Sequence, residues 1–419
     1  MHIFDLIALI IFISGLFIFV NTMFLKLPSS LGLMILTLLL SVGVMVAGMI
    51  VPSLNVIDEI KDFDFSEVLN QMVISVILFA GGLNMNLRAL GDQKVPVIIL
   101  SLVGALLSTL VIGTIVFYFL NFLGIEINYM YSLIFGAVIS STDPISASNI
   151  TTRFKLPRML LNKVEGESLF NGSVSVVLAF VLYHLELVAE LHEITGFDFV
   201  KVLSLELIGG VVLGLAMGYL GLFLLKFIDN EDVHIEVLIT IALVLVGSYI
   251  SGMFEIYSKM VSLIMGLFIG NMSRAGESEG DSVGGYVYKF WDLLEQTVAV
   301  MLFVLMGLEM LVIEWKTEYF AAGFFAVNIV LFGRWVSIFI PIKVMKMMQI
   351  PFDKNSIPVI TWGAFRGGLP IALVLAFHDF PGKDLLITMT YVVVVSSMLF
   401  QGFTLPILMR ERFQYREKT

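Results

Sequence analysis

The 419-residue chain has no cysteine, and only 14% of its residues are charged. The absence of cysteine excludes disulfides, thiolate metal sites and cysteine nucleophiles. The sequence also has no phosphate-binding glycine loop, no histidine cluster with metal-ligand spacing and no nucleophile triad motif, so we expect neither an enzyme nor a resident cofactor. The net charge of −10 argues against nucleic acid as a partner.

What the chain has instead is apolar surface, since 58% of its residues are hydrophobic. Runs of about 20 mostly apolar residues, the length that crosses a bilayer, recur along the whole sequence. We expect thirteen spans, near residues 4–24, 31–51, 65–85, 95–120, 130–150, 161–187, 197–228, 234–254, 258–272, 290–312, 320–345, 356–377 and 385–409. The prediction is therefore an all-α integral membrane protein with about 13 transmembrane helices.

The ends of the chain predict a single transmembrane domain over residues 1–419. The first run follows only the residues MHIFD, without a basic leader or a small-residue cleavage site, so we expect it to be retained. Residues 410–419 leave no room for a soluble regulatory domain. Most of the 24 lysines and arginines fall on one side of the membrane if the N-terminus is outside and the C-terminus is cytoplasmic, which is the orientation that the positive-inside rule favours.

Four ionisable residues lie inside apolar runs: Asp143, Glu167, Arg334 and Arg366. Each costs at least ~2.5 kcal/mol to insert, so each is a candidate for function. Pro144 removes a backbone donor and disfavours helix at the residue before it, so the fifth span should break beside Asp143. Carbonyl groups that the break leaves unpaired could ligate a cation.

A second break is expected in the twelfth span, where Gly363, Gly367, Gly368 and Pro370 interrupt the apolar run 356–377. The fifth and twelfth spans hold matching positions in two inverted repeats of six helices, spans 1–6 and 8–13, with the seventh span as a linker. Broken helices at matching positions are a sequence sign of a secondary-transporter site. The alternative is that these prolines and glycines only allow kinks or close packing.

Glu167 and Arg334 lie in spans that can border the same cavity, and we expect them to pair. Such a pair need not stabilise the fold, because desolvation offsets much of the attraction. The alternatives are that Glu167 belongs to a solvated helix cap, since Lys163 is close in sequence, and that Arg334 extends to the interface. Other acids, among them Glu295, lie near span ends and are expected to reach water.

Seven motifs, in this order, carry a family resemblance: LFAGGLNMNLRAL (78–90), STDP (141–144), EGESLFN (165–171), LFVLMGLEM (302–310), GRW (333–335), WGAFRGGLPIAL (362–373) and QGFTLP (401–406). With them the chain resembles bacterial sodium/proton antiporters of the monovalent cation/proton antiporter superfamily, on the sodium/proton exchanger branch.

The resemblance implies an exchanger of Na+, or of Li+ or K+, for H+ in the cytoplasmic membrane, serving pH homeostasis. It also implies a homodimer in which broken spans 5 and 12 cross in a core that moves like an elevator. The corresponding parts are a dimerisation part over about 1–90 and 230–312, a core over about 91–190 and 320–409, and a linker helix at 197–228.

The resemblance also implies roles for individual residues. The shared cation and proton site would comprise Asp143, the main-chain oxygen of Thr142, Ser168 and Asn171. Glu167 and Arg334 would form a structural ion pair. The unwound positions would be Pro144, Arg366, Gly367 and Gly368.

One position departs from the family pattern: the Asn of the sixth-span motif is normally followed by an Asp, whereas Asn171 is followed by Gly172. If Glu167 and Arg334 cancel, one exchangeable negative charge remains, on Asp143. One Na+ or one H+ would neutralise it, with weaker cation affinity than two acids would give. The alternatives are a transport-impaired sensor, regulator or subunit that works with an accessory membrane protein, and an ion leak or channel.

Overall fold

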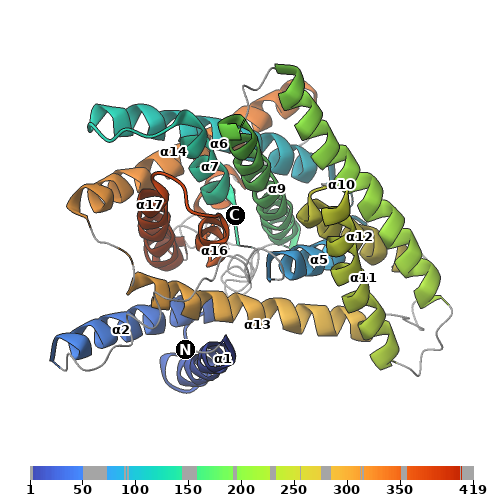
Figure 1. Ribbon diagram of the computed structural model, residues 1–419, viewed down its shortest axis with the longest axis horizontal. Helices are drawn as coiled ribbons and strands as arrows, with labels where there is room; N and C mark the ends of the chain where they lie inside the picture. Colours follow the sequence, from blue (N-terminus) through green and yellow to red (C-terminus); the bar gives the residue numbers. More distant parts are fainter. Residues whose placement is uncertain are drawn as a thin grey trace, which may run out of the picture. The chain divides into compact units, whose positions relative to one another are not determined.

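The computed structural model describes residues 3–50, 73–88, 91, 94–143, 158–191, 196–226, 233–254, 256–274, 285–311, 313, 316–350, 356–405 and 407. Within this part of the chain all regular secondary structure is helical, and no strand occurs. Figure 1 shows these helices coloured along the chain. The all-α fold predicted from the sequence is confirmed.

The described helices occur in the following order along the chain. They are α1 (Ile3–Val20), η1 (Asn21–Leu25), α2 (Ser29–Ile50), α5 (Ile74–Asn84), α6 (Lys94–Phe122), α7 (Tyr129–Ser140), α9 (Arg158–Leu191), α10 (Gly196–Leu225), α11 (Val233–Met253), α12 (Ser258–Ser273), α13 (Gly285–Met310), α14 (Thr317–Met347), α15 (Ser356–Trp362), α16 (Leu369–Ala376), α17 (Lys383–Ser396) and η4 (Ser397–Gln401). Two of them, η1 and η4, are single π-helical turns that continue α1 and α17.

The thirteen predicted spans each have a helix or a pair of helices among the described residues. Nine stretches of the described chain are long and apolar enough to cross a membrane. The remaining four predicted spans correspond to the shorter helices α5, α7 and α12 and to the pair α15 and α16. Residues 65–72 of span 3 and residues 144–150 of span 5 lie outside the described residues.

The outward faces of the long helices are apolar. Phe12 of α1, Val212 of α10, Leu238 of α11 and Phe324 of α14 are all more than half exposed in the isolated chain. A water-soluble protein rarely exposes so many large apolar side chains on neighbouring turns. In a bilayer these faces contact lipid, so the surface agrees with an integral membrane protein.

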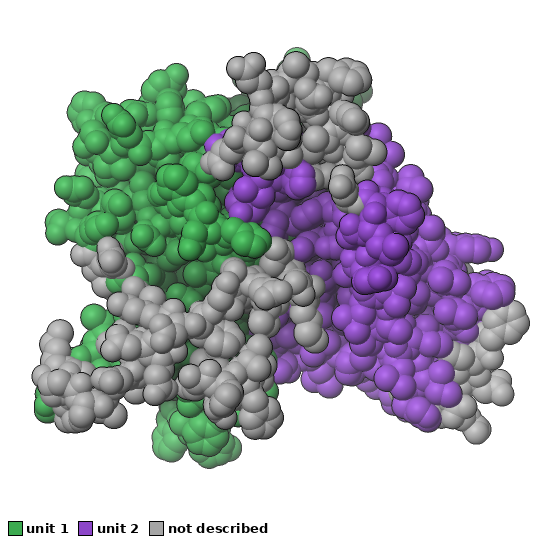
Figure 2. All heavy atoms as spheres, in the orientation of Figure 1, with its two compact units in different colours: residues 1–66, 95–176, 299–419 green, residues 67–94, 177–298 purple. Residues whose placement is uncertain are grey.

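The chain forms two compact units (Figure 2). Unit 1 comprises residues 1–66, 95–176 and 299–419, and unit 2 comprises residues 67–94 and 177–298. Two of the boundaries fall inside α9 and α13, so each of these helices contributes to both units. The division into a dimerisation part and a moving core, which the family resemblance implies, stays a prediction.

Glycines explain how unit 2 packs around the short helix α12. A Cβ atom on Gly266 would overlap the carbonyl oxygen of Phe79, and one on Gly270 would overlap that of Leu83, so the backbones of α12 and α5 touch at these positions. On the other side, Gly214 of α10 lies against the side chain of Ile264. Small residues four apart let membrane helices approach closely, where dispersion forces hold them.

The LNMNLR part of the first motif covers the last two residues of α5 and the four residues that follow, and side chains of α12 and of the residue after α12 hold this segment in place. Arg274 donates to the carbonyl oxygens of Leu83 (3.0 Å) and Met85 (3.2 Å), and Asn271 donates to that of Met85 at 2.9 Å. These bonds satisfy carbonyls that a helix end leaves without partners. The motif therefore fixes how α5 ends within unit 2.

Replacing Gly266 with alanine should destabilise unit 2. The added Cβ meets main-chain rather than side-chain atoms of α5, so α12 must move away, and overpacking of this kind costs about 1–3 kcal/mol. We expect a lower melting temperature in detergent. The matched control is Gly252→Ala in α11, where a Cβ would meet nothing within 4 Å and the melting temperature should not fall. Equal melting curves for the two variants would contradict this packing.

Candidate cation site

The end of α7 meets an interrupted helix in unit 1. In the described part of the fifth span the helix ends at Ser140, and the twelfth span is divided into α15 and α16 by residues 363–368. The N–H of Asp143 donates to the carbonyl oxygen of Phe365 at 2.9 Å, so the two breaks are joined backbone to backbone. Pro144, which predicted the first break, lies outside the described residues.

Glycine at position 367 is required by the carboxylate of Asp143. A Cβ built on Gly367 would overlap Oδ2 of that carboxylate. Gly368 then precedes α16, whose second residue, Pro370, has no backbone N–H to lose in the first turn. The twelfth span therefore unwinds where the carboxylate of the fifth span approaches it.

Hydrogen bonds from side chains attach α9 to the end of α7. Asn171 donates through Nδ2 to the carbonyl oxygen of Ser140 (2.8 Å) and to Oγ1 of Thr142 (3.0 Å). The hydroxyl of Thr142 donates in turn to the carbonyl oxygen of Ser168 at 3.2 Å. The structure thus brings together Thr142, Ser168 and Asn171, which the resemblance assigns to one site, beside Asp143.

The departure at position 172 is also a close contact. A Cβ built on Gly172 would lie 2.7 Å from the main-chain oxygen of Thr142. That oxygen is one of the predicted cation ligands. Gly172 therefore removes a carboxylate and also allows the backbone of α9 to approach the break more closely than any other residue would.

Several neutral oxygens at the break have no hydrogen-bond partner among the described residues. They are the hydroxyl oxygens of Ser141 and Ser168 and Oδ1 of Asn171, all of them buried. Hard cations prefer oxygen ligands, and buried polar atoms are costly when unpaired. With the carboxylate of Asp143, which is only partly buried, these atoms form a donor set suited to a small monovalent cation.

Glu167 and Arg334 form a buried ion pair. Nη2 of Arg334 lies 2.6 Å from Oε2 of Glu167, and both side chains are 2% exposed. The pair joins α9 to α14, so Glu167 is not part of a solvated cap and Arg334 does not extend to an interface. Ser101 of α6 donates to the carbonyl oxygen of Glu167 at 3.3 Å, which holds a third helix beside the pair.

Arg366 is also buried, yet its guanidinium binds carbonyl groups. It donates through Nε to Ile139 (3.0 Å) and through Nη1 to Ala364 (2.7 Å). The carbonyl of Ile139 lies in the last turn of α7, where the helix dipole is negative. Arg366 therefore joins the two breaks a second time and brings a further positive charge into the group, which the count of charges from the sequence did not include.

Glu295 in unit 2 does not reach water as expected. It is 8% exposed, and its Oε2 accepts a hydrogen bond from Asn84 at 3.0 Å. Buried carboxylates need such partners. Asp292, three residues earlier on α13, is exposed.

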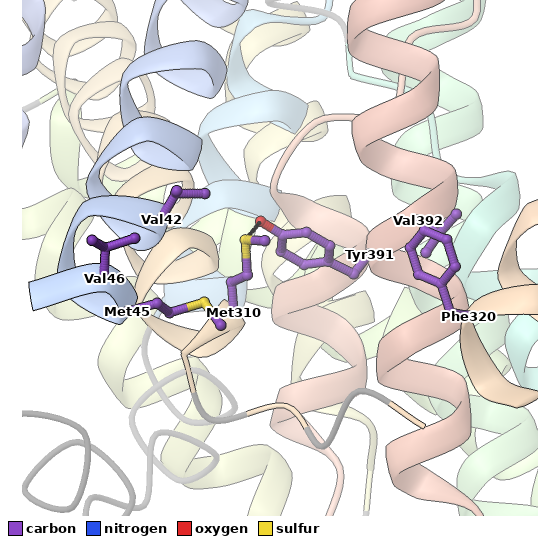
Figure 3. Close-up of a pocket in the computed structure, with 7 residues that line it drawn as sticks. All are labelled: Val42, Met45, Val46, Met310, Phe320, Tyr391 and Val392. Atoms are coloured by element: carbon purple, nitrogen blue, oxygen red, sulfur yellow. Dashed lines mark hydrogen bonds between the residues drawn. The ribbon is translucent and has the colours of Figure 1, made fainter. Parts of the chain in front are cut away.

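An apolar cavity in unit 1 is not suited to the cation. Its volume is about 480 Å³, and Figure 3 shows it between residues of α2 and α17. It is lined by Val42, Met45, Val46, Met310, Phe320, Tyr391 and Val392. None of these lining side chains carries a charged oxygen that could bind an ion. The hydroxyl of Tyr391 donates to the sulfur of Met310 at 3.1 Å.

The motifs and the fold agree with what comparison with known proteins finds. The family model described as the transmembrane sodium/hydrogen exchanger matches residues 7–411. The chain belongs to the sodium/hydrogen exchanger family. The resemblance inferred from the seven motifs is thereby confirmed.

Relatives in this exchanger family align with most of the chain. The Na+/H+ antiporter NhaP of Pseudomonas aeruginosa is 34% identical over 416 residues, which are 97% of this chain and 96% of the relative. The Na+/H+ antiporter NhaG of Bacillus atrophaeus is 29% identical over 364 residues, 84% of this chain and 66% of the relative. Antiporters are secondary transporters rather than enzymes, which agrees with the prediction.

A solved structure supports the fold of this exchanger. The sodium proton antiporter MjNhaP1 from Methanocaldococcus jannaschii matches with a TM-score of 0.74 at 19% identity, over 97% of each chain. At this identity the likeness concerns the fold alone. It confirms the predicted all-helical architecture with inverted repeats.

Proposed function

We propose that this exchanger moves Na+ in exchange for H+ across the cytoplasmic membrane, with Asp143 as the group that both loads neutralise. The observation that carries the proposal is the position of the Asp143 carboxylate, which lies against Gly367 where the backbone after α7 bonds to the segment between α15 and α16. Names of the relatives support the same activity. The site residues are Asp143, Thr142, Ser168 and Asn171.

Exchange at such a site follows because Na+ and H+ compete for the same carboxylate. A carboxylate that binds either a proton or a cation cannot bind both, so each load displaces the other on the side where it is abundant. Both loads carry one positive charge, and a 1:1 cycle is therefore electroneutral. The apparent Na+ affinity should fall as the pH is lowered, because protons then occupy more of the sites.

The neutral oxygens would select the cation by their number and spacing. The main-chain oxygen of Thr142, Oγ of Ser168 and Oδ1 of Asn171 would replace part of the hydration shell of Na+. The ion pair of Glu167 and Arg334 would hold α9 and α14 in register while contributing no net charge. The family resemblance adds a homodimer whose core moves as an elevator, and the distribution of lysine and arginine adds an N-terminus outside and a cytoplasmic C-terminus.

The test is a flux measurement in proteoliposomes that contain a pH-sensitive dye. Coupled exchange predicts proton movement that starts when Na+ is added, reverses when the Na+ gradient is reversed, and persists when the membrane voltage is clamped to zero with valinomycin and K+. Flat traces at all Na+ concentrations would refute the proposal and favour a role as sensor, regulator or subunit.

Arg366 favours a second candidate, uncoupled cation passage. The group formed by the partly buried Asp143 and the buried Glu167, Arg334 and Arg366 contains two acids and two bases, so it is formally neutral when Asp143 is ionised and binds no cation. Strict exchange needs the empty, charged site to be costly to move, and formal neutrality lowers this cost. Sodium current that follows voltage without proton counterflow would support this candidate over exchange.

Position 172 separates the effects of charge and of space. In Gly172→Ala the added Cβ must displace the main chain of Thr142, so the Na+ concentration that gives half-maximal rate should rise. Gly172→Asp carries the same Cβ and adds a carboxylate, whose attraction for Na+ should lower that concentration at least about tenfold relative to Gly172→Ala. Equal Na+ dependence of the two variants would mean that position 172 acts only through packing.

A further inference from the structure

The last of the seven motifs, QGFTLP, has no place in the site described so far. It begins in η4, the π-helical turn that continues α17 from Ser397 to Gln401. Single π turns inside α-helices frequently occur at functional sites, since they turn side chains away from the regular helical pattern. In unit 1, α17 packs against α7, α14 and α16, so η4 belongs to the same part of the fold as the crossing.

Two hydrogen bonds connect this part of the thirteenth span to the break in the twelfth. The backbone N–H of Arg366 donates to Oγ of Ser397 at 3.3 Å. Nε1 of Trp362, the last residue of α15, donates to Oγ1 of Thr404 at 2.8 Å. The thirteenth span therefore holds the twelfth at the start and near the middle of residues 363–368.

Gln401 orients the hydroxyl of Ser397. Ser397 donates its single proton to Oε1 of Gln401, so the lone pairs of the same oxygen are free to accept the N–H of Arg366. Both side chains are at least nine-tenths buried, so water does not compete for these bonds. An unwound backbone inside the membrane requires partners of this kind, since an unpaired N–H there is costly.

We propose that Ser397 and Gln401 are positioning residues for cation binding. By holding the N–H of Arg366 they fix the peptide that joins it to Phe365. The carbonyl of this peptide accepts the N–H of Asp143, and the side chain beyond it reaches Ile139. The two residues therefore set the backbone on which the Asp143 carboxylate rests, without contacting the cation themselves.

The effect on transport rests on the proposed function and is tested by the Na+ dependence of exchange. Ser397→Ala should raise the Na+ concentration for half-maximal rate about tenfold, the value of one net hydrogen bond, with a smaller change in maximal rate. Gln401→Leu should act in the same direction. Ser397→Thr keeps the hydroxyl and should stay within about twofold of the wild type.

The matched control is Thr404→Val, which removes the bond to Trp362 and keeps the bond to Arg366. Its half-maximal Na+ concentration should match that of the wild type. A purely structural role for Ser397 would instead lower the maximal rate or the melting temperature of both variants alike and leave the half-maximal concentration unchanged. That result would overturn the proposed role in binding.

Deuterium uptake tests the hydrogen-bonded contact without any transport. Peptides that cover residues 363–368 should take up deuterium faster in Ser397→Ala than in the wild type and in Ser397→Thr, because the amide of Arg366 loses its acceptor. Unchanged uptake would overturn the contact itself. If the wild type exchanges no Na+ for H+, the proposed function fails, and this measurement still decides whether Ser397 holds the unwound segment.

Discussion

Asp143→Asn should abolish exchange of Na+ for H+, with a loss of at least about 100-fold. A unit charge close to a cation contributes about 4 kcal/mol at an effective dielectric constant of 20, and the neutral amide cannot replace it. Asparagine also has no titratable group, so the transported proton has nowhere to bind at this position. The measurement is the initial rate of Na+-driven pH change in proteoliposomes of equal protein content.

The fold of this variant should be intact, which makes the loss interpretable. The bond from the N–H of residue 143 to Phe365 uses the main chain, and asparagine has the volume of aspartate. The control is Asp379→Asn, the same change at a fully exposed side chain that pairs with Lys383 on the surface of unit 1. It should exchange at the wild-type rate. Unchanged exchange in Asp143→Asn would show that the loads bind elsewhere.

The spans could be predicted from the sequence because the bilayer imposes their length and composition. Apolar runs of about 20 residues have no other stable use, and backbone hydrogen bonding makes them helices. Boundaries were less predictable where helices are short. Gly266 and Gly270 allow neighbouring helices of unit 2 to pack closely against α12. Counting apolar residues along the sequence cannot reveal such contacts between helices.

The ion pair could be anticipated for a similar reason. A charge inside an apolar run needs a partner, and few residues of opposite sign were available to Glu167. The partners of Arg366 could not be anticipated, because they are main-chain carbonyls and every residue carries one. The contact between Gly172 and Thr142 was equally hidden, since the absence of a side chain does not say what takes its space.

The burial of Glu295 shows the limit of position along a span as a guide. Its place near the end of a helix suggested contact with water, whereas Asn84 of a different helix binds it in unit 2. Polar pairs between helices distant in sequence have no local pattern. The same holds for the bond between Arg366 and Ser397, although the motif QGFTLP marked the segment.

Removing one member of the buried ion pair should be among the most damaging changes to stability. Glu167→Met leaves the Arg334 charge buried without its carboxylate, and a broken buried pair costs about 3–5 kcal/mol. We expect a large fall in melting temperature. The Na+ concentration for half-maximal exchange should also rise, because an uncompensated positive charge then lies near the cation.

The double variant Glu167→Met/Arg334→Met should recover most of both losses. The pair is made through one short bond, and Oε1 of Glu167 and Nε of Arg334 have no other partner among the described residues, so much of its desolvation cost is not offset. Removing both charges leaves the net charge of the buried group unchanged. A double variant as unstable as Glu167→Met would contradict the argument from desolvation. A double variant that folds yet requires as much Na+ as Glu167→Met would show that the carboxylate of Glu167 acts on the cation itself rather than through its arginine.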